Sequence, residues 1–226
     1  MKYKIEQFFS RSYEKQINEN MFYYNYIFPN IEVFDYLTSL INISYSEFIR
    51  YIQSHIQIVP ITSKDIPQFS SIKDCTTNIC KKLSAVNDPG LSFVDIGKLL
   101  LDDGKVRNDG AYIKYGENHS KTSYDLGLTQ VKENTWYLSC IGYVFLSFDE
   151  KSQNAILARC VLRNRFVSRI IADSEHADVN VMKKMLCLSK STMIRRKPNV
   201  MSLINLCESQ IHEDHSSLLK KIYFEL

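Results

Sequence analysis

The sequence contains no run of about 18 consecutive apolar residues, the length that a membrane-spanning helix needs. The N-terminus places Glu6 where a signal peptide would have its apolar stretch, and no small-residue cleavage site follows. The six cysteines are scattered without a C-x-x-C pair, and most of them lie in apolar periodic segments. These features predict a cytoplasmic protein with no membrane partner, in which the cysteines are reduced and buried.

Motifs of the common enzyme classes are also missing, including the P-loop, G-x-G-x-x-G, H-E-x-x-H and G-x-S-x-G. The five histidines have no metal-ligand spacing. His212 and His215 are three residues apart but adjoin Glu213 and Asp214, as on a polar helix surface. The sequence therefore predicts a protein without a cofactor and without a metal site.

A nuclease active site is the alternative that these absences leave open. Two D-x-K tripeptides occur, at 103–105 and 149–151, and restriction-type nucleases use such a tripeptide with a further acid to bind Mg²⁺ and position a water. Asp88 or Asp95 could supply that acid for the first tripeptide. The motif is short enough to arise by chance, and Asp103 falls at an expected helix end, so we favour a protein without catalytic activity.

Glycine is absent from residues 1–89 and 143–226, and all seven glycines lie between positions 90 and 142. Since glycine permits positive φ angles and close backbone approach, a compact segment rich in turns is expected between two mainly helical arms. We predict three regions: a helical N-terminal region with a linker (1–72), a first winged-helix module (73–148), and a helical module with a second helix-turn-helix (149–226).

Apolar and aromatic residues of the N-terminal region recur at spacings of three and four, as in packed helices. They are Phe22, Tyr23, Tyr26, Ile27, Val33, Phe34, Tyr36, Leu37, Leu40 and Ile41. Ser44 followed by Glu47 is a capping-box pattern, which predicts a helix over 47–58. Prolines and hydroxyl residues indicate a linker over 59–72, and a further helix is expected over about 73–86.

The central segment predicts two helices, a polar helix and a β-hairpin. Ser92 is the expected N-cap of the first helix, and Gly116 is expected to break a short helix that precedes a polar one over about 117–126. The stretches 135–139 and 143–146 have β-like composition and predict the two strands of the hairpin. This is the order of a winged helix-turn-helix, in which the polar helix lies in a groove of DNA.

Two parts of this segment, 110–128 and 136–142, resemble the tandem winged-helix DNA-recognition modules of bacterial restriction-modification and related defence proteins. Those modules carry the pattern K-Y-G-E-N-H-x-K-x-A-x-x-L-G-L, and here 114–121 matches it, with Ser123 in place of the usual alanine. The resemblance continues over 181–205, which is similar to the ending L-S-x-S-T-x-x-R-R-x-x-N-V-x-x-L-I.

The resemblance implies a mainly α fold with tandem winged helix-turn-helix modules, a helical N-terminal region and one small β-wing hairpin. It also implies sequence-directed binding of double-stranded DNA. Proteins of this kind often act as the recognition component of a restriction or phage-defence system, together with a nuclease, methyltransferase or ATPase subunit.

The net charge of +3 is distributed unevenly along the chain. Residues 1–89 have no net charge, residues 90–148 have −1, and residues 149–226 have +4. Within the last region, 159–197 holds ten Lys or Arg and three Asp or Glu, an excess of +7 that suits a polyanionic partner. A basic surface that binds nothing in particular is the alternative.

The third region has its own helix-turn-helix pattern. Residues 150–172 predict an amphipathic helix from which four arginines project: Arg159, Arg163, Arg165 and Arg169. A helix over 178–186, a short turn and a further helix capped by Ser189 or Ser191 complete the layout. Pro198 is expected to kink that last helix or to start a new one.

Two sets of side chains are the expected DNA contacts, because amide, imidazole, hydroxyl and cationic groups pair with base edges and phosphates. In the first module they are Lys114, Asn118, His119, Ser120, Lys121 and Ser123. In the second module they are Lys190, Ser191, Thr192, Arg195, Arg196 and Lys197. Asn118 could instead cap its helix. A small Mg²⁺-dependent type II restriction endonuclease and a helical protein-interaction adaptor are the alternative functions.

Overall fold

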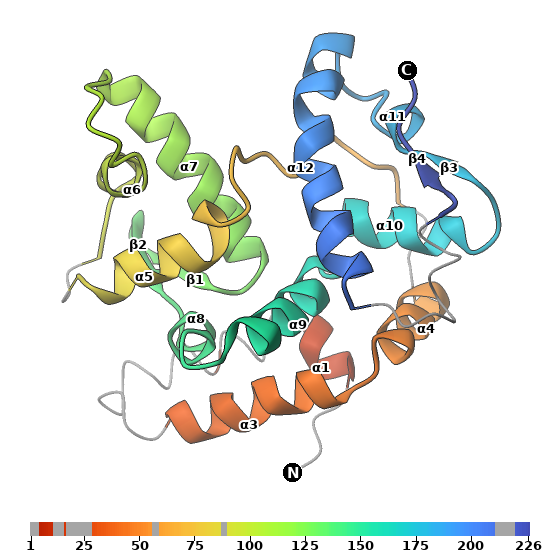
Figure 1. Ribbon diagram of the computed structural model, residues 1–226, viewed down its shortest axis with the longest axis horizontal. Helices are drawn as coiled ribbons and strands as arrows, with labels where there is room; N and C mark the ends of the chain where they lie inside the picture. The colour runs from red at the N-terminus through yellow and green to blue at the C-terminus, as the bar shows by residue number, and fades with distance from the viewer. Residues whose placement is uncertain (1–4, 11–15, 17–28, 56–58, 87–89, 211–219) are drawn as a thin grey trace. The chain divides into compact units, whose positions relative to one another are not determined.

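The computed structural model describes residues 5–10, 16, 29–55, 59–86, 90–210 and 220–226 (Figure 1). Within these ranges the chain is mainly helical with one small antiparallel hairpin, as the sequence predicts. None of the described helices combines the length and apolar character that crossing a membrane requires. Some residues considered above lie outside the described ranges: Phe22, Tyr23, Tyr26, Ile27, Asp88, His212, Glu213, Asp214 and His215.

The chain divides into two compact units, each made of two stretches of sequence. Unit 1 contains 1–39 and 69–153, and unit 2 contains 40–68 and 154–226. Residues 1–72, expected to form one N-terminal region, therefore contribute to both units. The domain boundaries that the sequence predicts after residues 72 and 148 lie near two places where the chain passes from one unit to the other, after residue 68 and after residue 153.

Unit 1 consists of helices packed with a β-hairpin. Its elements are α1 (Ile5–Phe9), most of α3 (Pro29–Asn42), the π-helical turn η1 (Asp74–Asn78), α5 (Ile79–Ser84), α6 (Phe93–Leu100), α7 (Asp109–Asp125), β1 (Thr129–Lys132), β2 (Thr135–Leu138), α8 (Cys140–Phe145) and the start of α9 (Glu150–Val161). Leu91, between α5 and α6, forms an antiparallel bridge with Trp136 of β2. The hairpin therefore gains a third, very short strand.

Helices α6 and α7 cross so closely that glycine is required on both sides of the contact. A Cβ on Gly97 would lie 2.0 Å from the carbonyl oxygen of Tyr112, and a Cβ on Gly116 would lie 1.9 Å from that of Phe93. The prediction that Gly116 breaks a helix is wrong, because α7 is continuous from Asp109 to Asp125. A glycine inside a helix lowers the stability of the helix by only about 1 kcal/mol relative to alanine. Here the absence of a side chain lets the backbone of the neighbouring helix approach.

The hairpin lies earlier in the chain than predicted. Strand β1 pairs with β2 through a two-residue turn at Glu133 and Asn134, both of which have positive φ angles. A two-residue turn of this kind has the backbone twist that suits the strands it joins. The stretch 135–139 is thus the second strand of the hairpin and not the first.

The second strand predicted from the sequence, 143–146, is wrong because 140–145 form α8. Ser139 caps this helix: its Oγ accepts a hydrogen bond from the Gly142 amide (2.8 Å) and donates one to the Gly127 carbonyl (2.7 Å). A Cβ on Gly142 would lie 2.1 Å from the Leu128 carbonyl oxygen. The helix therefore docks directly on the backbone that leads into the hairpin.

Two predicted N-caps are confirmed. Ser92 and Asp95 form a capping box at the start of α6. At the start of α4 (Tyr45–His55), the Glu47 amide donates to the Ser44 hydroxyl (3.3 Å), and the Ser44 amide donates to the Glu47 carboxylate (3.1 Å). Each box satisfies amide groups that the first turn of a helix leaves without partners.

Helices of unit 2 pack around a buried apolar cluster. The elements of this unit are α4, the remainder of α9, α10 (Arg165–Ser174), β3 (Val179–Asn180), α11 (Val181–Lys184), α12 (Lys190–Glu208) and β4 (Ile222–Tyr223), with β3 parallel to β4. The buried cluster contains Ile66, Phe166, Ile170, Val179, Val181, Met182, Met185, Met193, Val200 and Ile204. The expected linker 59–72 thus contributes Ile66 to this core.

The helices predicted for this unit need three corrections. The helix expected over 150–172 is two helices, because the Asn164 side chain caps α10 by accepting a hydrogen bond from the Val167 amide (3.1 Å). The helix expected over 178–186 is shorter, since its first residues pair with β4. No new helix starts after Pro198, which lies inside α12.

The burial of the cysteines follows the prediction at five of six positions. All six are free thiols; Cys75, Cys80, Cys140, Cys160 and Cys207 are buried, and Cys187 is exposed. Burial raises the pKa of Cys140 and of Cys207 to about 12. The buried thiols therefore remain protonated and act as small apolar groups.

We expect Gly116→Ala to destabilise the protein by about 2 kcal/mol or more, because the added methyl group collides with the backbone of α6. Urea unfolding measures the change. The matched control is Gly110→Ala in the same helix, where the nearest atom to an added Cβ is 3.5 Å away. Alanine at that site should be neutral or stabilising by up to about 1 kcal/mol. Equal stability of the two variants would contradict the close crossing.

Candidate nucleic-acid interface

Helix α7 has an exposed face that includes Gly110, Ile113, Lys114, Lys121 and Tyr124. Asp109, Ala111 and Asp125, near the two ends of the helix, are exposed as well. Glu117 lies between the two lysines and accepts hydrogen bonds from Lys114 (2.9 Å) and Lys121 (2.7 Å). These contacts hold the pKa of Glu117 below its ordinary value. The expected contact residues Lys114 and Lys121 are therefore exposed, and one carboxylate bridges them.

Three of the expected DNA contacts on α7 are instead in the interior of unit 1. His119 is 1% exposed, and Ser120 and Ser123 are fully buried. The expectation that these side chains face a ligand is wrong, because they lie on the side of α7 that packs inward with Gly116. Asn118 is half-buried, and the alternative that it caps the helix is also wrong, since Asn108 is the N-cap of α7.

His119 is held as a neutral imidazole. Its Nδ1 lies 2.7 Å from the Tyr115 carbonyl oxygen and must donate a proton to it, so Nε2 is the acceptor. Nε2 accepts a long hydrogen bond from the Ser70 amide (3.4 Å), and the ring stacks on Tyr115 with centroids 4.0 Å apart. Burial lowers the pKa of His119 below its ordinary value of 6.5.

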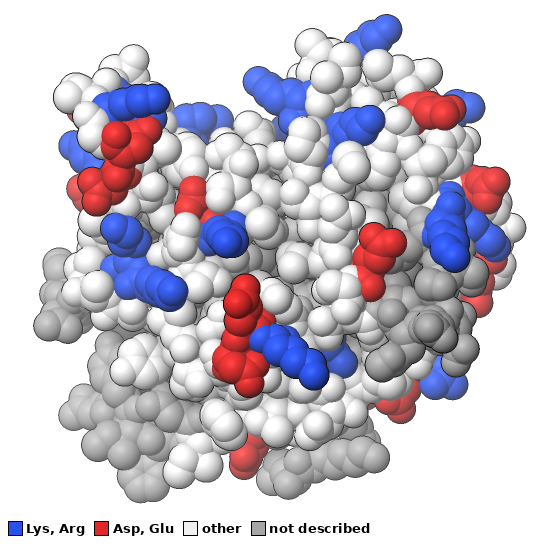
Figure 2. Space-filling model, viewed as in Figure 1, with Lys and Arg blue, Asp and Glu red and all other residues white. Residues whose placement is uncertain are grey.

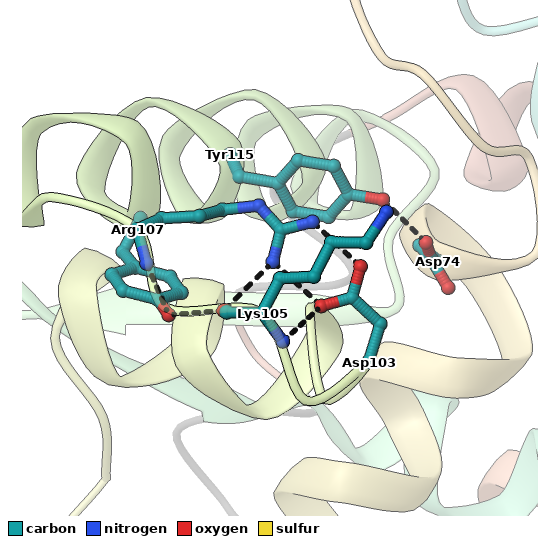
Figure 3. Close-up of polar contacts among 6 residues, drawn as sticks. Asp74, Asp103, Lys105, Arg107 and Tyr115 are labelled. Atoms are coloured by element: carbon teal, nitrogen blue, oxygen red, sulfur yellow. Dashed lines mark hydrogen bonds and ion pairs between the residues drawn. The ribbon is translucent and has the colours of Figure 1, made fainter.

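Figure 3 shows the candidate nuclease tripeptide 103–105 in the loop between α6 and α7. Both carboxylate oxygens of Asp103 accept hydrogen bonds from Arg107, at 2.6 Å each, and the pKa of Asp103 is held far below its ordinary value. Asp95 belongs to the capping box of α6, and Asp149 accepts a hydrogen bond from the Ser152 amide (2.8 Å). Each candidate acid among the described residues thus has a structural partner.

Tyr115 anchors α7 to η1, as Figure 3 also shows. Its hydroxyl donates a hydrogen bond to Asp74 (2.6 Å), and burial together with this carboxylate raises the pKa of Tyr115 to about 12. Asp74 also accepts a hydrogen bond from Asn78 (2.6 Å). In the described part of the chain, His, Cys, Asp and Glu form no group of three or more that could hold a metal ion.

The segment 181–197, which contains α11 and the start of α12, carries six basic residues and no acidic one. Ser189 caps α12, as one of the two predicted options, by accepting a hydrogen bond from the Thr192 amide (3.4 Å). Lys190, Ser191 and Arg195 are exposed. Among the described residues no ion pair involves Lys190 or Arg195, whereas Lys184 pairs with Asp173 (2.6 Å). Figure 2 shows basic side chains near the upper end of α12.

The surface over α6 and α7 differs from this basic segment. In Figure 2, acidic and basic side chains lie next to one another there (upper left). The ion pairs of this part of unit 1 include Lys98 with Asp109 (3.7 Å) and Arg107 with Asp103. The surface over α6 and α7 thus mixes charges of both signs, whereas the segment 181–197 carries no acidic residue of its own.

Arg196 has a structural role and does not belong to the exposed set. Its guanidinium donates hydrogen bonds to the carbonyl oxygens of Ser63 (2.9 Å) and Ile66 (3.0 Å) and to the side chain of Gln68 (2.8 Å). This clamp fixes the irregular segment that inserts Ile66 into the core of unit 2. The expected DNA contact Arg196 is thus half-buried with its guanidinium hydrogen-bonded to protein oxygens, and it is less accessible than its exposed neighbour Arg195.

Lys197 and Thr192 are only partly accessible to a ligand, because both contact other groups of the protein. The Lys197 ammonium lies 3.4 Å from the Phe224 carbonyl oxygen and above the Phe224 ring. Thr192 is half-buried, and its Oγ1 accepts a hydrogen bond from Ser189 (3.0 Å). Of the expected contacts in this module, Lys190, Ser191 and Arg195 are thus the accessible ones.

Three of the arginines expected to project from the 150–172 helix also bind protein groups. Arg159 is 5% exposed and donates to the carbonyl oxygens of Ile41 and Ile43. Arg165 pairs with Asp65 (3.6 Å), and Arg169 pairs with Asp173 (3.0 Å). The partners of Arg159 and Arg165 were not evident from the sequence, because Ile41, Ile43 and Asp65 are about 100 residues or more away along the chain, whereas Asp173 is four residues from Arg169 in the same helix.

A scan against models of known protein families, a search of curated proteins and a search of solved structures found no match to this chain.

We expect Arg196→Ala to lower the stability of unit 2 by about 1–3 kcal/mol, since it leaves backbone carbonyls of the 63–68 segment without donors. Arg195→Ala removes the same charge from an exposed neighbour and should change stability by less than about 0.5 kcal/mol. Thermal unfolding of both variants measures the difference. Similar losses in both would contradict the clamp.

We expect stability to fall as the pH drops below about 6.5, because the unfolded chain then binds a proton at His119 that the folded protein does not. Urea unfolding from about pH 7 to about pH 5 measures this slope. His119→Gln should flatten it. His176→Gln, which removes an exposed histidine, should leave it unchanged. An unaltered slope in the His119 variant would show that this imidazole is not held neutral.

Proposed function

We propose that this protein binds double-stranded DNA, with α7 of unit 1 and α12 of unit 2 as the helices that face the duplex. The single observation that carries the proposal is the start of α12, where the exposed Lys190 and Arg195 adjoin an exposed, capped helix terminus. Phosphates bind to such surfaces through cationic side chains and through the free amides of the first turn.

The connectivity of unit 1 supports a winged helix-turn-helix. The chain runs through α5, the short strand at Leu91, α6, α7 and the hairpin, and the strand at Leu91 pairs with β2. In such a module α7 would enter the major groove and the hairpin would be the wing. The exposed face of α7 supports this role, since it bears Lys114 and Lys121 and is not covered within unit 1.

The corresponding part of unit 2 is a shorter helix-turn-helix. Helix α11 and α12 are joined by residues 185–189, and the buried Met185 and Met193 fix the turn on the core. Lys190 and Arg195 extend from the exposed side of α12, where they can reach phosphates or guanine edges.

We further infer that the protein serves as the recognition component of a restriction-modification or phage-defence system, with a nuclease, methyltransferase or ATPase as its partner. The support for this step is the resemblance of 110–128 and 181–205 to the recognition modules of such systems. The hydrogen-bonded state of Asp103 favours a binding role over the nuclease alternative.

We expect the double variant Lys190→Ala, Arg195→Ala to bind duplex DNA more than about tenfold more weakly than the unmodified protein at moderate salt. Fluorescence anisotropy over a series of salt concentrations measures the affinity, and the double variant should also show a shallower salt dependence. The matched control is Lys81→Ala, Lys151→Ala, which removes two exposed charges elsewhere.

Two outcomes would contradict this assignment. Equal affinity of the two double variants would show that α12 does not contact the DNA. Incubation of the same duplex with Mg²⁺ or Mn²⁺ provides the second test, because cleavage that is lost in Asp103→Ala would favour the nuclease alternative.

A further inference from the structure

The helices α7 and α12 carry the same two residue types at the same positions. Counted from the first residue of each helix, the fifth residue is isoleucine, Ile113 or Ile194, and the sixth is basic, Lys114 or Arg195. Each helix is capped by a side chain, Asn108 or Ser189, so its start is well defined. The positions are therefore equivalent in the two helices, which belong to different units.

Both isoleucines are exposed although their helices have buried faces available. Ile113 is 44% exposed and Ile194 is 50% exposed. A β-branched side chain on the exposed face of a helix contributes little to packing and is a poorer helix former than alanine or lysine. Single exposed apolar residues are common on protein surfaces, so the observation that carries the argument is the recurrence of an isoleucine followed by a basic residue at the same position of two capped helices. The recurrence points to the same kind of ligand for both helices.

We infer that Ile113 and Ile194 each contact the 5-methyl group of a pyrimidine in the major groove of DNA. This inference rests on the proposed function, in which α7 and α12 contact DNA, and it places the second turn of each helix against base edges. The 5-methyl group is the apolar feature that thymine presents in the major groove, and aliphatic side chains recognise it by contact. The basic residue that follows each isoleucine can reach a phosphate or a guanine.

Two natural bases carry this methyl group, thymine and 5-methylcytosine, and the test distinguishes them. Duplexes that bind the protein are selected from two random pools, one copied with thymine and cytosine and the other with uracil and 5-methylcytosine. Each selected duplex is then made with and without the methyl groups, which leaves every hydrogen-bonding group of the bases in place.

Removal of each contacted methyl group should weaken binding of the unmodified protein by about fourfold, the value for burial of one methylene-sized group. Ile113→Ala and Ile194→Ala should each lose part of this preference, and the double variant should lose all of it. The control is Ile31→Ala, which truncates an isoleucine that is 70% exposed on α3 and should keep the full preference. Because the substituted residues are exposed and alanine favours helix, all variants should remain folded.

The outcomes separate this inference from the proposal on which it rests. A methyl preference for thymine or for 5-methylcytosine that disappears in the double variant supports the inference and identifies the base. Equal binding with and without the methyl groups, or a preference that survives in the double variant, overturns it while DNA binding stands. Failure to select any duplex from either pool overturns the proposed function itself.

Discussion

The close crossing of α6 and α7 is the constraint on which the architecture of unit 1 depends. At both Gly97 and Gly116 a Cβ would lie 2.0 Å or less from a carbonyl oxygen of the other helix, so the two backbones can approach only because both residues are glycine. His119, Ser120 and Ser123 are buried on α7, and His119 stacks on Tyr115. The crossing also determines which face of α7 is exposed, and hence which side chains can meet a ligand.

The basic residues at the start of α12 in unit 2 fall into two groups, those that bind other parts of the protein and those that remain on the surface. Arg196 and Lys197 contact the protein through carbonyl oxygens, whereas Lys190 and Arg195 remain on the surface. Charge counted along the sequence does not distinguish these groups, so the excess of +7 over 159–197 overstates the charge available to a partner. What remains is a smaller patch at the start of α12, where the helix terminus adds to its attraction for anions.

The features that the sequence predicted correctly are those determined by neighbouring residues. The caps at Ser44, Ser92 and Ser189 depend on hydrogen bonds within one turn, and all three are present. The errors concern contacts with distant parts of the chain. From its neighbours in the sequence, Gly116 is predicted to break a helix. In the structure it lies inside α7, where the absence of a side chain leaves room for the backbone of Phe93 in α6.

The same distinction between local and distant contacts decides which residues of the candidate site could be predicted from the sequence. Exposure of Lys114 or Lys190 follows from the polarity of its own helix, whereas the partner of Arg196 is a segment about 130 residues earlier. The prediction of a strand at 143–146 was wrong for a different reason. A short run of apolar residues is compatible with a strand and with a buried helix alike. The serine before α8 was the available signal, since serine is a favoured helix cap and Ser139 caps α8.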